Sequence, residues 1–249
     1  MRGSLDSRQV CTTCEVKQRL DQSSLVLKPS AQLVQLKVLD AYNIIMAKFH
    51  TLIDTLDILE YDGRKISFST NEGKPVRIQI PRMYMPFGIS GFTPPVGNTK
   101  WNVDFSMKGY DEEGNYVKAF YEILTKTEEK IIENVSKQSE KIFHKYMTVE
   151  DLKPMFNSNI KRSPDREPKF RIKVDTSADG VIKAGVFNNE RKHLKDTAAD
   201  KLYARNSGVA IVELTSVYFL NKKFGATWKL HQLVVHEPQQ LKGFQFVLD

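Results

Sequence analysis

Period-two hydrophobic patterns stand on both sides of one long segment with a helical pattern, and this arrangement constrains the fold more than any other feature. Alternation of apolar and polar residues is typical of β-strands with one buried face. It is clear in Val76–Ile80, where the apolar residues share one face, and in Lys169–Val174. The sequence therefore predicts a fold that is mainly β with α (α+β).

Turn residues separate the alternating runs. Asp62-Gly63 is a two-residue hairpin signal, and residues 208–220 are apolar on both faces, which is typical of a central strand. Pro81–Gly97 holds several prolines and Gly88, so we expect a loop there with no regular element. That loop is either functional or folds its methionines and aromatics back onto the core. The expected strands are 56–61, 64–70, 75–80, 101–107, 169–174, 181–187, 208–220, 226–236 and 243–247.

Two segments have the helical pattern. Residues 116–146 contain no Gly or Pro and predict one long helix, whereas residues 159–168 read as an exposed basic connector. Residues 31–54 repeat apolar side chains at spacings of three and four and predict an N-terminal helix. We therefore divide the chain into a mobile N-terminal segment (1–30), this helix (31–54) and a main domain (55–249).

Composition excludes several classes of protein. Of the 249 residues 41% are hydrophobic, which rules out a wholly disordered chain, and no apolar run is long enough to cross a membrane. Cys11-x-x-Cys14 is half a zinc site with no second pair of ligands. The five histidines are scattered and form no metal or catalytic motif. We expect no enzyme activity, no catalytic residues, no metal and no cofactor.

The basic charge of the chain is regional. The net charge is +7, and residues 153–205 hold 13 Lys and Arg against 7 Asp and Glu. Within this stretch Lys169, Arg171 and Lys173 share one strand face, about 7 Å apart, a spacing that suits a phosphodiester backbone. Alternatively, these cations pair with acids on a neighbouring strand. The residues just before the strand are also basic: Lys161, Arg162 and Arg166.

A second group of cations and aromatics lies near the C-terminal end. Lys222-Lys223-Phe224 precedes Trp228-Lys229. Aromatic faces beside cations are typical of proteins that bind single-stranded nucleic acid. For Trp228 the alternative is a place in the core.

Three segments resemble the single-stranded-DNA-binding proteins of nucleocytoplasmic large DNA viruses. Ile78–Gly88 is similar to the strand–loop signature of that family, and Val217–Leu230 with Gln232 is similar to its second signature. Phe170–Val174 stands where the family has a basic strand between them. The resemblance extends over roughly residues 55–247.

The resemblance implies an OB-fold-like antiparallel barrel, and strands on both sides of one helix agree with it. It implies sequence-nonspecific binding of single-stranded DNA in viral DNA replication, recombination or repair, with viral replication proteins as further partners. The implied location is the viral factory in the host cytoplasm, or the nucleus or virion. Residues 31–54 have no counterpart in the family, and the chain ends at Asp249 without the acidic tail of many such proteins.

Candidate binding residues are cations that neutralise phosphates and aromatics that stack on bases. The cations are Arg77, Arg82, Lys169, Arg171, Lys173, Lys222, Lys223 and Lys229, and the aromatics are Tyr84, Phe87, Phe224 and Trp228. The long helix would brace the barrel or mediate self-association. Two alternatives stay open: a viral structural or scaffold protein that holds other proteins with the helix and the Pro81–Gly97 loop, and an RNA-binding protein.

Overall fold

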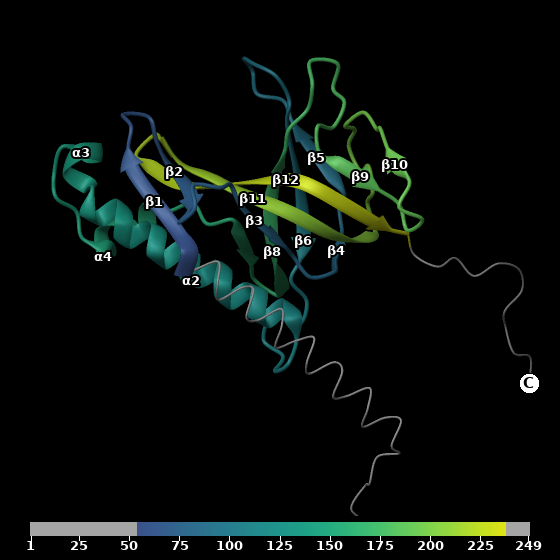
Figure 1. The fold of residues 1–249 in the computed structure, drawn as a ribbon, viewed down its shortest axis with the longest axis horizontal. Helices are drawn as coiled ribbons and strands as arrows, with labels where there is room; N and C mark the ends of the chain where they lie inside the picture. The colour runs from purple at the N-terminus through teal and green to yellow at the C-terminus, as the bar shows by residue number, and fades with distance from the viewer. Residues whose placement is uncertain (1–53, 238–249) are drawn as a thin grey trace, which may run out of the picture. The chain divides into compact units, whose positions relative to one another are not determined.

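The structure is a computed structural model that describes residues 54–237 (Figure 1). The expected mobile segment 1–30, the Cys11/Cys14 pair, the strand 243–247 and all but the last residue of the expected helix 31–54 lie outside the described residues. No helix within 54–237 is long and apolar enough to span a bilayer.

In this part of the chain twelve strands form one sheet around which three α-helices are arranged. The strands are β1 (Leu56–Tyr61), β2 (Lys65–Thr70), β3 (Val76–Gln79), β4 (Met83–Met85), β5 (Ile89–Phe92), β6 (Lys100–Ser106), β7 (Ile160–Ser163), β8 (Arg166–Val174), β9 (Gly185–Phe187), β10 (His193–Leu194), β11 (Asn206–Leu220) and β12 (Lys223–His236). The helices are α2 (Tyr116–Lys137), α3 (Ser139–Phe143) and α4 (Val149–Leu152), and a 3-10 turn covers Lys153–Met155.

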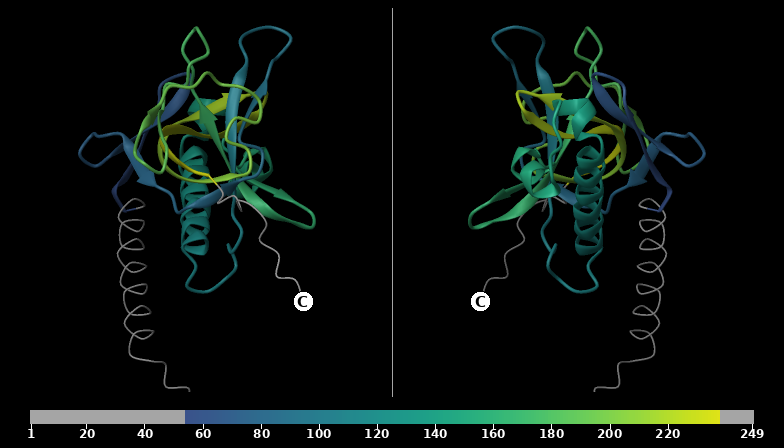
Figure 2. Two further views of the ribbon diagram at one scale, coloured as in Figure 1. Left: turned by 90° about the vertical axis from the view of Figure 1, so that its right-hand side faces the viewer. Right: turned by 90° about the vertical axis from the view of Figure 1, so that its left-hand side faces the viewer.

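Five of the strands close into a barrel. Around the ring β4 pairs with β6, β6 with β8, β8 with β12, β12 with β11, and β11 with β4. The β8–β12 pair is parallel and the other four are antiparallel. The mainly β prediction is confirmed, and a closed five-stranded barrel is consistent with an OB-like fold. Figure 2 shows α2 alongside the barrel strands, and the ring of Phe120 on α2 meets that of Phe170 on β8 at 5.3 Å.

The longest hairpin of the barrel joins β11 to β12. Asn221 and Lys222 form its turn, with φ values of 50° and 60°, the left-handed conformation of a type I′ turn that matches the twist of the strands. Along β11 buried residues alternate with half-buried ones. The predicted central strand is thus present, with one face in the core and the other partly covered.

The predicted helix over 116–146 is broken into two. Gln138, with φ −104° and ψ 7°, separates α2 from α3. Its Oε1 accepts a hydrogen bond from the backbone N–H of Tyr61 (2.7 Å), and its Nε2 donates to the carbonyl of Leu59 (3.3 Å). The break therefore follows from tertiary hydrogen bonds to β1, which a periodic pattern does not contain. Tyr146, the last residue of the predicted helix, lies beyond α3 and is exposed.

The Pro81–Gly97 segment contains β4 and β5, so the prediction that it holds no regular element is wrong. Its prolines stand between the strands rather than inside them. Gly88 has φ 61° and packs so closely that an added Cβ would lie 2.2 Å from the carbonyl oxygen of Leu202. The methionines of β4 are buried, whereas Tyr84 between them is exposed. Part of the segment thus folds onto the core and part faces outward.

The prediction of an exposed connector over residues 159–168 is also wrong, because β7 and the start of β8 form a hairpin there. Asp165 occupies the turn with φ 58°, and Ser163 pairs with Arg166. β8 therefore begins three residues before the predicted start at Lys169.

Candidate nucleic-acid interface

Three basic residues of β8 and three polar residues of β6 form one outward face. In β8 the apolar residues 170, 172 and 174 are buried and the cations alternate with them, as predicted. We call the six outward residues the β6–β8 face. The register pairs Lys169 with Ser106, Arg171 with Asp104, and Lys173 with Asn102.

Asp104 neutralises the centre of this face. Its side chain is 4% exposed, and its carboxylate accepts hydrogen bonds from Nε (2.7 Å) and Nη2 (2.9 Å) of Arg171. Hydrogen bonding to Asp104 raises the pKa of the Arg171 guanidinium above its ordinary value. The Nζ of Lys169 lies 4.0 Å from the same carboxylate. The expected alternative, a cation paired with an acid on the neighbouring strand, therefore holds for Arg171.

Asp175 forms ion pairs with two lysines at one end of the β6–β8 face. Its carboxylate accepts hydrogen bonds from Nζ of Lys173 and of Lys229, each at 2.7 Å. Burial acts to raise the pKa of Asp175, but the bonds from the two lysines outweigh it, and the pKa lies below its ordinary value. Lys229 of β12 is thus brought beside Lys173 of β8.

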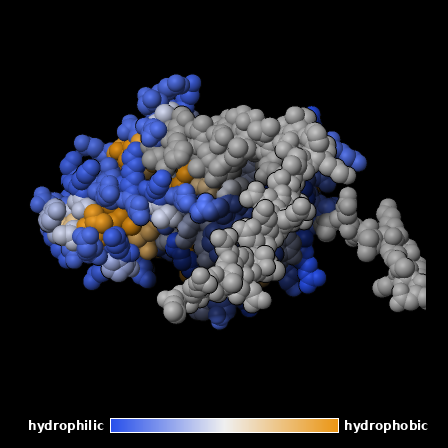
Figure 3. Space-filling view, turned by 90° about the horizontal axis from the view of Figure 1, so that it is seen from below, coloured by the Kyte–Doolittle hydropathy of each residue, from blue (hydrophilic) through white to orange (hydrophobic). Residues whose placement is uncertain are grey.

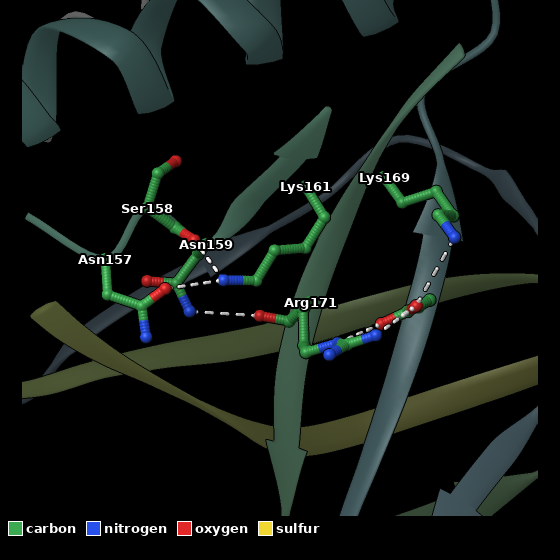
Figure 4. A network of polar contacts seen from close by, with 7 residues as sticks. Asn157, Ser158, Asn159, Lys161, Lys169 and Arg171 are labelled. Atoms are coloured by element: carbon green, nitrogen blue, oxygen red, sulfur yellow. Dashed lines mark hydrogen bonds and ion pairs between the residues drawn. The ribbon is translucent and has the colours of Figure 1, made fainter. Parts of the chain in front are cut away.

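The loop before β7 borders the face on another side (Figure 4). Lys161 donates from Nζ to Oδ1 of Asn157 (2.8 Å) and to the carbonyl of Ser158 (2.6 Å), and Asn159 donates from Nδ2 to the carbonyl of Arg171 (3.1 Å). Burial, helped by the charge of Arg171, lowers the pKa of Lys161. The loop and the face line a depression of about 400 Å³, and Tyr218 of β11 and residues 226–228 of β12 line it as well.

Glu128 of α2 holds this loop in place. Its carboxylate accepts hydrogen bonds from Oγ of Ser158 (2.8 Å) and from the backbone N–H of Asn159 (3.1 Å). Burial nevertheless raises the pKa of Glu128 above its ordinary value. The hydrogen bonds therefore offset only part of the cost of burying the charge.

Near pH 7 we expect Glu128→Gln to have a higher free energy of unfolding than the wild type. This difference should decrease as the pH falls from about 7 to about 4.5. A carboxyl group with a raised folded-state pKa takes up a proton on folding, so the wild type gains free energy of unfolding as the pH falls through that pKa. Glutamine does not titrate. Urea unfolding of both proteins across this range measures the difference, with Glu129→Gln, an exposed neighbour on α2, as the control. A difference that is independent of pH would contradict the burial argument.

Two exposed aromatic rings lie at the other end of the β6–β8 face. The side chains of Tyr84 and Phe87 are each 46% exposed, and Nζ of Lys169 lies 4.7 Å from the centre of the Phe87 ring. Both rings line a depression of about 440 Å³ together with Lys108 and Arg166. This end therefore combines open aromatic faces with several cations.

The structure buries the other two aromatic candidates. Phe224 is fully buried and Trp228 is 2% exposed, with its ring in edge contact with Phe170 at 5.7 Å. A base cannot stack on a ring that core side chains cover. The expectation that Phe224 and Trp228 stack is therefore wrong, and the core alternative for Trp228 is confirmed. Both follow the alternation in the first half of β12, where the even-numbered residues from 224 to 230 are buried.

The remaining cationic candidates lie outside the β6–β8 face. Arg77 on β3 pairs with Glu213 of β11 at 2.6 Å. Arg82 donates from Nε to Oγ of Ser207 (2.8 Å) and lines a further depression beside Tyr84. The other two, Lys222 and Lys223, are exposed at the β11–β12 turn.

Sequence reasoning missed several residues that line these depressions. The alternation in 101–107 already puts Asn102 and Asp104 on one strand face, but only the β6–β8 pairing brings them beside the cations. Lys108 follows β6 with no pattern that marks it. The Asn157–Asn159 loop has no signal in the sequence, because its position depends on Glu128.

Other kinds of site find less support in the described residues. Between 54 and 237 no group of three or more His, Cys, Asp or Glu side chains could hold a metal ion. The described residues that are visible in Figure 3 are mostly hydrophilic, with hydrophobic areas among them.

This chain is similar to solved structures of phage proteins and to one family model. The single-stranded DNA-binding protein from bacteriophage Enc34, in complex with ssDNA, has a TM-score of 0.41 and 14% identity, over 76% of this chain and 98% of that chain. The single-stranded DNA binding protein gp2.5 of bacteriophage T7 has a TM-score of 0.42 and 12% identity, over 68% and 90%. No curated protein matches. The family model described as "Family of unknown function (DUF5871)" matches residues 113–246, more than half of the chain, and the chain therefore belongs to that family.

Proposed function

We propose that this protein binds single-stranded DNA along the β6–β8 face and is not an enzyme. The observation that carries the proposal is the pair of half-exposed rings, Tyr84 and Phe87, at the end of a strand face that bears Lys169, Arg171 and Lys173. Stacking and phosphate contacts tolerate any base sequence, so the binding would be largely nonspecific.

The exposed rings favour a single strand over a duplex. A base can stack on a side chain only when its face is free, and in a duplex that face is covered by the neighbouring base pairs. Each base stacked on an aromatic ring contributes about 1–3 kcal/mol. Tyr84 and Phe87 together would hold two neighbouring bases. Lys169, whose Nζ lies over one face of the Phe87 ring, would contact the phosphate.

The cations would supply the salt-dependent part of the binding. Lys108 and Arg166 are exposed beside the two rings, and Lys161 and Lys173 border the depression farther along the face. Each phosphate neutralised on a single strand releases counterions and steepens the salt dependence.

Titration of the full chain with fluorescent oligo-dT, duplex DNA and RNA of equal length at several salt concentrations tests the proposal. We expect oligo-dT to bind more tightly than the duplex. Equal affinity for duplex and single strand would contradict stacking. Tighter binding of RNA would point to an RNA-binding protein, and the absence of any binding near physiological salt would favour a scaffold.

Removing one charge at a time tests which cations meet phosphates. Lys169→Gln and Lys108→Gln are each expected to lower the affinity for oligo-dT and to flatten the slope of log K against log salt by about 0.7, the value for one phosphate on a single strand. Arg64→Gln, in the exposed β1–β2 turn, serves as the control and should leave the slope unchanged. If the two face variants behave like this control, the strand does not follow the β6–β8 face.

The wider role proposed for the protein rests on the sequence resemblance to proteins of large DNA viruses. It comprises replication, recombination or repair of viral DNA in the host's cytoplasmic viral factory, the nucleus or the virion, with viral replication proteins as partners and self-association through α2. Detection of the protein at sites of viral DNA synthesis in infected cells would test this part.

A further inference from the structure

We propose that Arg171 recognises one base of the bound strand, that guanine is the base it fits, and that Asp104 is the positioning residue that makes this possible. The inference rests on the proposed function, because it concerns a strand that lies on the β6–β8 face. It starts from an arginine that a buried carboxylate fixes at the centre of that face.

The contacts with Asp104 leave a defined edge of the guanidinium free. Arginine has five N–H groups in a rigid plane, and the carboxylate takes one from Nε and one from Nη2. The N–H groups that remain are on Nη1 and Nη2, which can donate two parallel hydrogen bonds. The side chain of Arg171 is 44% exposed and lines the depression of about 400 Å³ with Asn102 and Lys161.

The charges around Arg171 favour a neutral partner over a phosphate. The carboxylate of Asp104 balances the guanidinium directly, and a phosphate placed over Arg171 would also approach that carboxylate. Lys169, whose Nζ lies 4.0 Å from that carboxylate rather than in a short bond to it, would contact the neighbouring phosphate. A base edge carries no net charge, so Asp104 would not repel it.

The free edge of Arg171 selects a base with two adjacent acceptors. Guanine presents O6 and N7, and the bidentate contact of arginine to this pair is the commonest specific contact between proteins and bases. Adenine places the N6 donor beside N7, and thymine has a single acceptor, O4, on that edge. Cytosine has two adjacent acceptors, O2 and N3, only on its Watson–Crick edge, so dC is the competitor that tests the guanine assignment. A strand bound mainly through stacking and phosphates would thus have a base preference at one position.

Competition binding with short oligonucleotides tests the assignment. A labelled dT oligomer of about ten nucleotides, within the usual site size of such proteins, is displaced by the same oligomer with one central dG, 7-deaza-dG or dC. We expect the dG oligomer to bind about tenfold more tightly than all-dT. The 7-deaza-dG oligomer, which lacks N7, and the dC oligomer should bind like all-dT.

The outcomes separate this inference from the proposed function. Binding of all-dT with no gain for dG overturns the role of Arg171 and leaves the proposed function intact. A gain for dC instead of dG overturns the guanine assignment. A protein that binds none of the oligomers overturns both proposals.

Two variants assign the preference to these residues. Arg171→Lys keeps the charge but loses the planar fork. A lysine can still donate to O6 and N7, so the dG preference should fall while the salt slope for dT stays the same. Asp104→Asn removes the neutralising charge and the fixed orientation, so the preference should fall while the salt slope steepens. A purely structural Asp104 would not steepen the slope. If Asp104→Asn does not fold, Arg171→Lys still decides, since a dG preference that this variant leaves undiminished overturns the inference.

Discussion

Replacing both Tyr84 and Phe87 by alanine is expected to weaken the binding of oligo-dT about 30-fold or more. Alanine substitution of an aromatic stacking platform costs about 1–3 kcal/mol per base, and about 1.4 kcal/mol corresponds to a tenfold change in affinity. Both rings are half exposed, so their removal should cost little stability. Fluorescence anisotropy titration at fixed salt measures the loss, and each single variant should account for roughly half of its free energy.

The salt slope and a matched variant identify stacking as the cause. The double variant removes no charge, so its slope of log K against log salt should equal that of the wild type. Tyr146→Ala removes another exposed aromatic ring, beyond α3, and should leave the affinity unchanged. A double variant that binds as tightly as Tyr146→Ala would exclude the two rings from the site.

Trp228→Ala is expected to lower the free energy of unfolding by about 3–5 kcal/mol, the usual cost of truncating a large buried aromatic side chain. The ring is 2% exposed and packs against Phe170 in the barrel interior, and alanine would leave a cavity there. Urea unfolding followed by circular dichroism measures the change.

Trp101→Ala is the matched control, because Trp101 is the other of the two tryptophans in the chain and is only half buried. It should cost less stability than Trp228→Ala. Under conditions in which Trp228→Ala remains folded, its affinity for oligo-dT should equal that of the wild type. If Trp228→Ala lowered the affinity for oligo-dT with little change in the free energy of unfolding, Trp228 would belong to the binding site.

Most of the strands were predictable, because a strand that is buried on one face alternates apolar and polar residues along the chain. The alternation in Lys169–Val174 predicted both the buried and the outward side chains of β8. The helix break at Gln138 was not predictable, because it depends on hydrogen bonds to β1, more than 70 residues away in the chain. The strand β4 was missed for a similar reason, since it pairs with the distant β11. The strand β5 pairs with the next strand, β6, and was missed because Gly88 and the prolines around it favoured a loop.

The positions of the basic residues in the candidate site were predictable, but the carboxylates that pair with them were not. Arg171 and Lys173 were expected to be available to phosphates, and the structure pairs both with carboxylates. The expected aromatic candidates divide in two, since Tyr84 and Phe87 are exposed and Phe224 and Trp228 are in the core. For an aromatic residue, the local pattern does not show whether the rest of the protein covers its ring.

The sequence by itself determined that the chain is mainly β, that Lys169, Arg171 and Lys173 share one face, and that basic charge concentrates between residues 153 and 205. These properties are local, because side-chain alternation and charge belong to neighbouring residues. Only the tertiary structure decided that Asp104 lies opposite Arg171, that the Asn157–Asn159 loop borders the face, and which aromatic rings stay open. Those properties come from strand register and barrel closure, which depend on contacts between residues far apart in the chain.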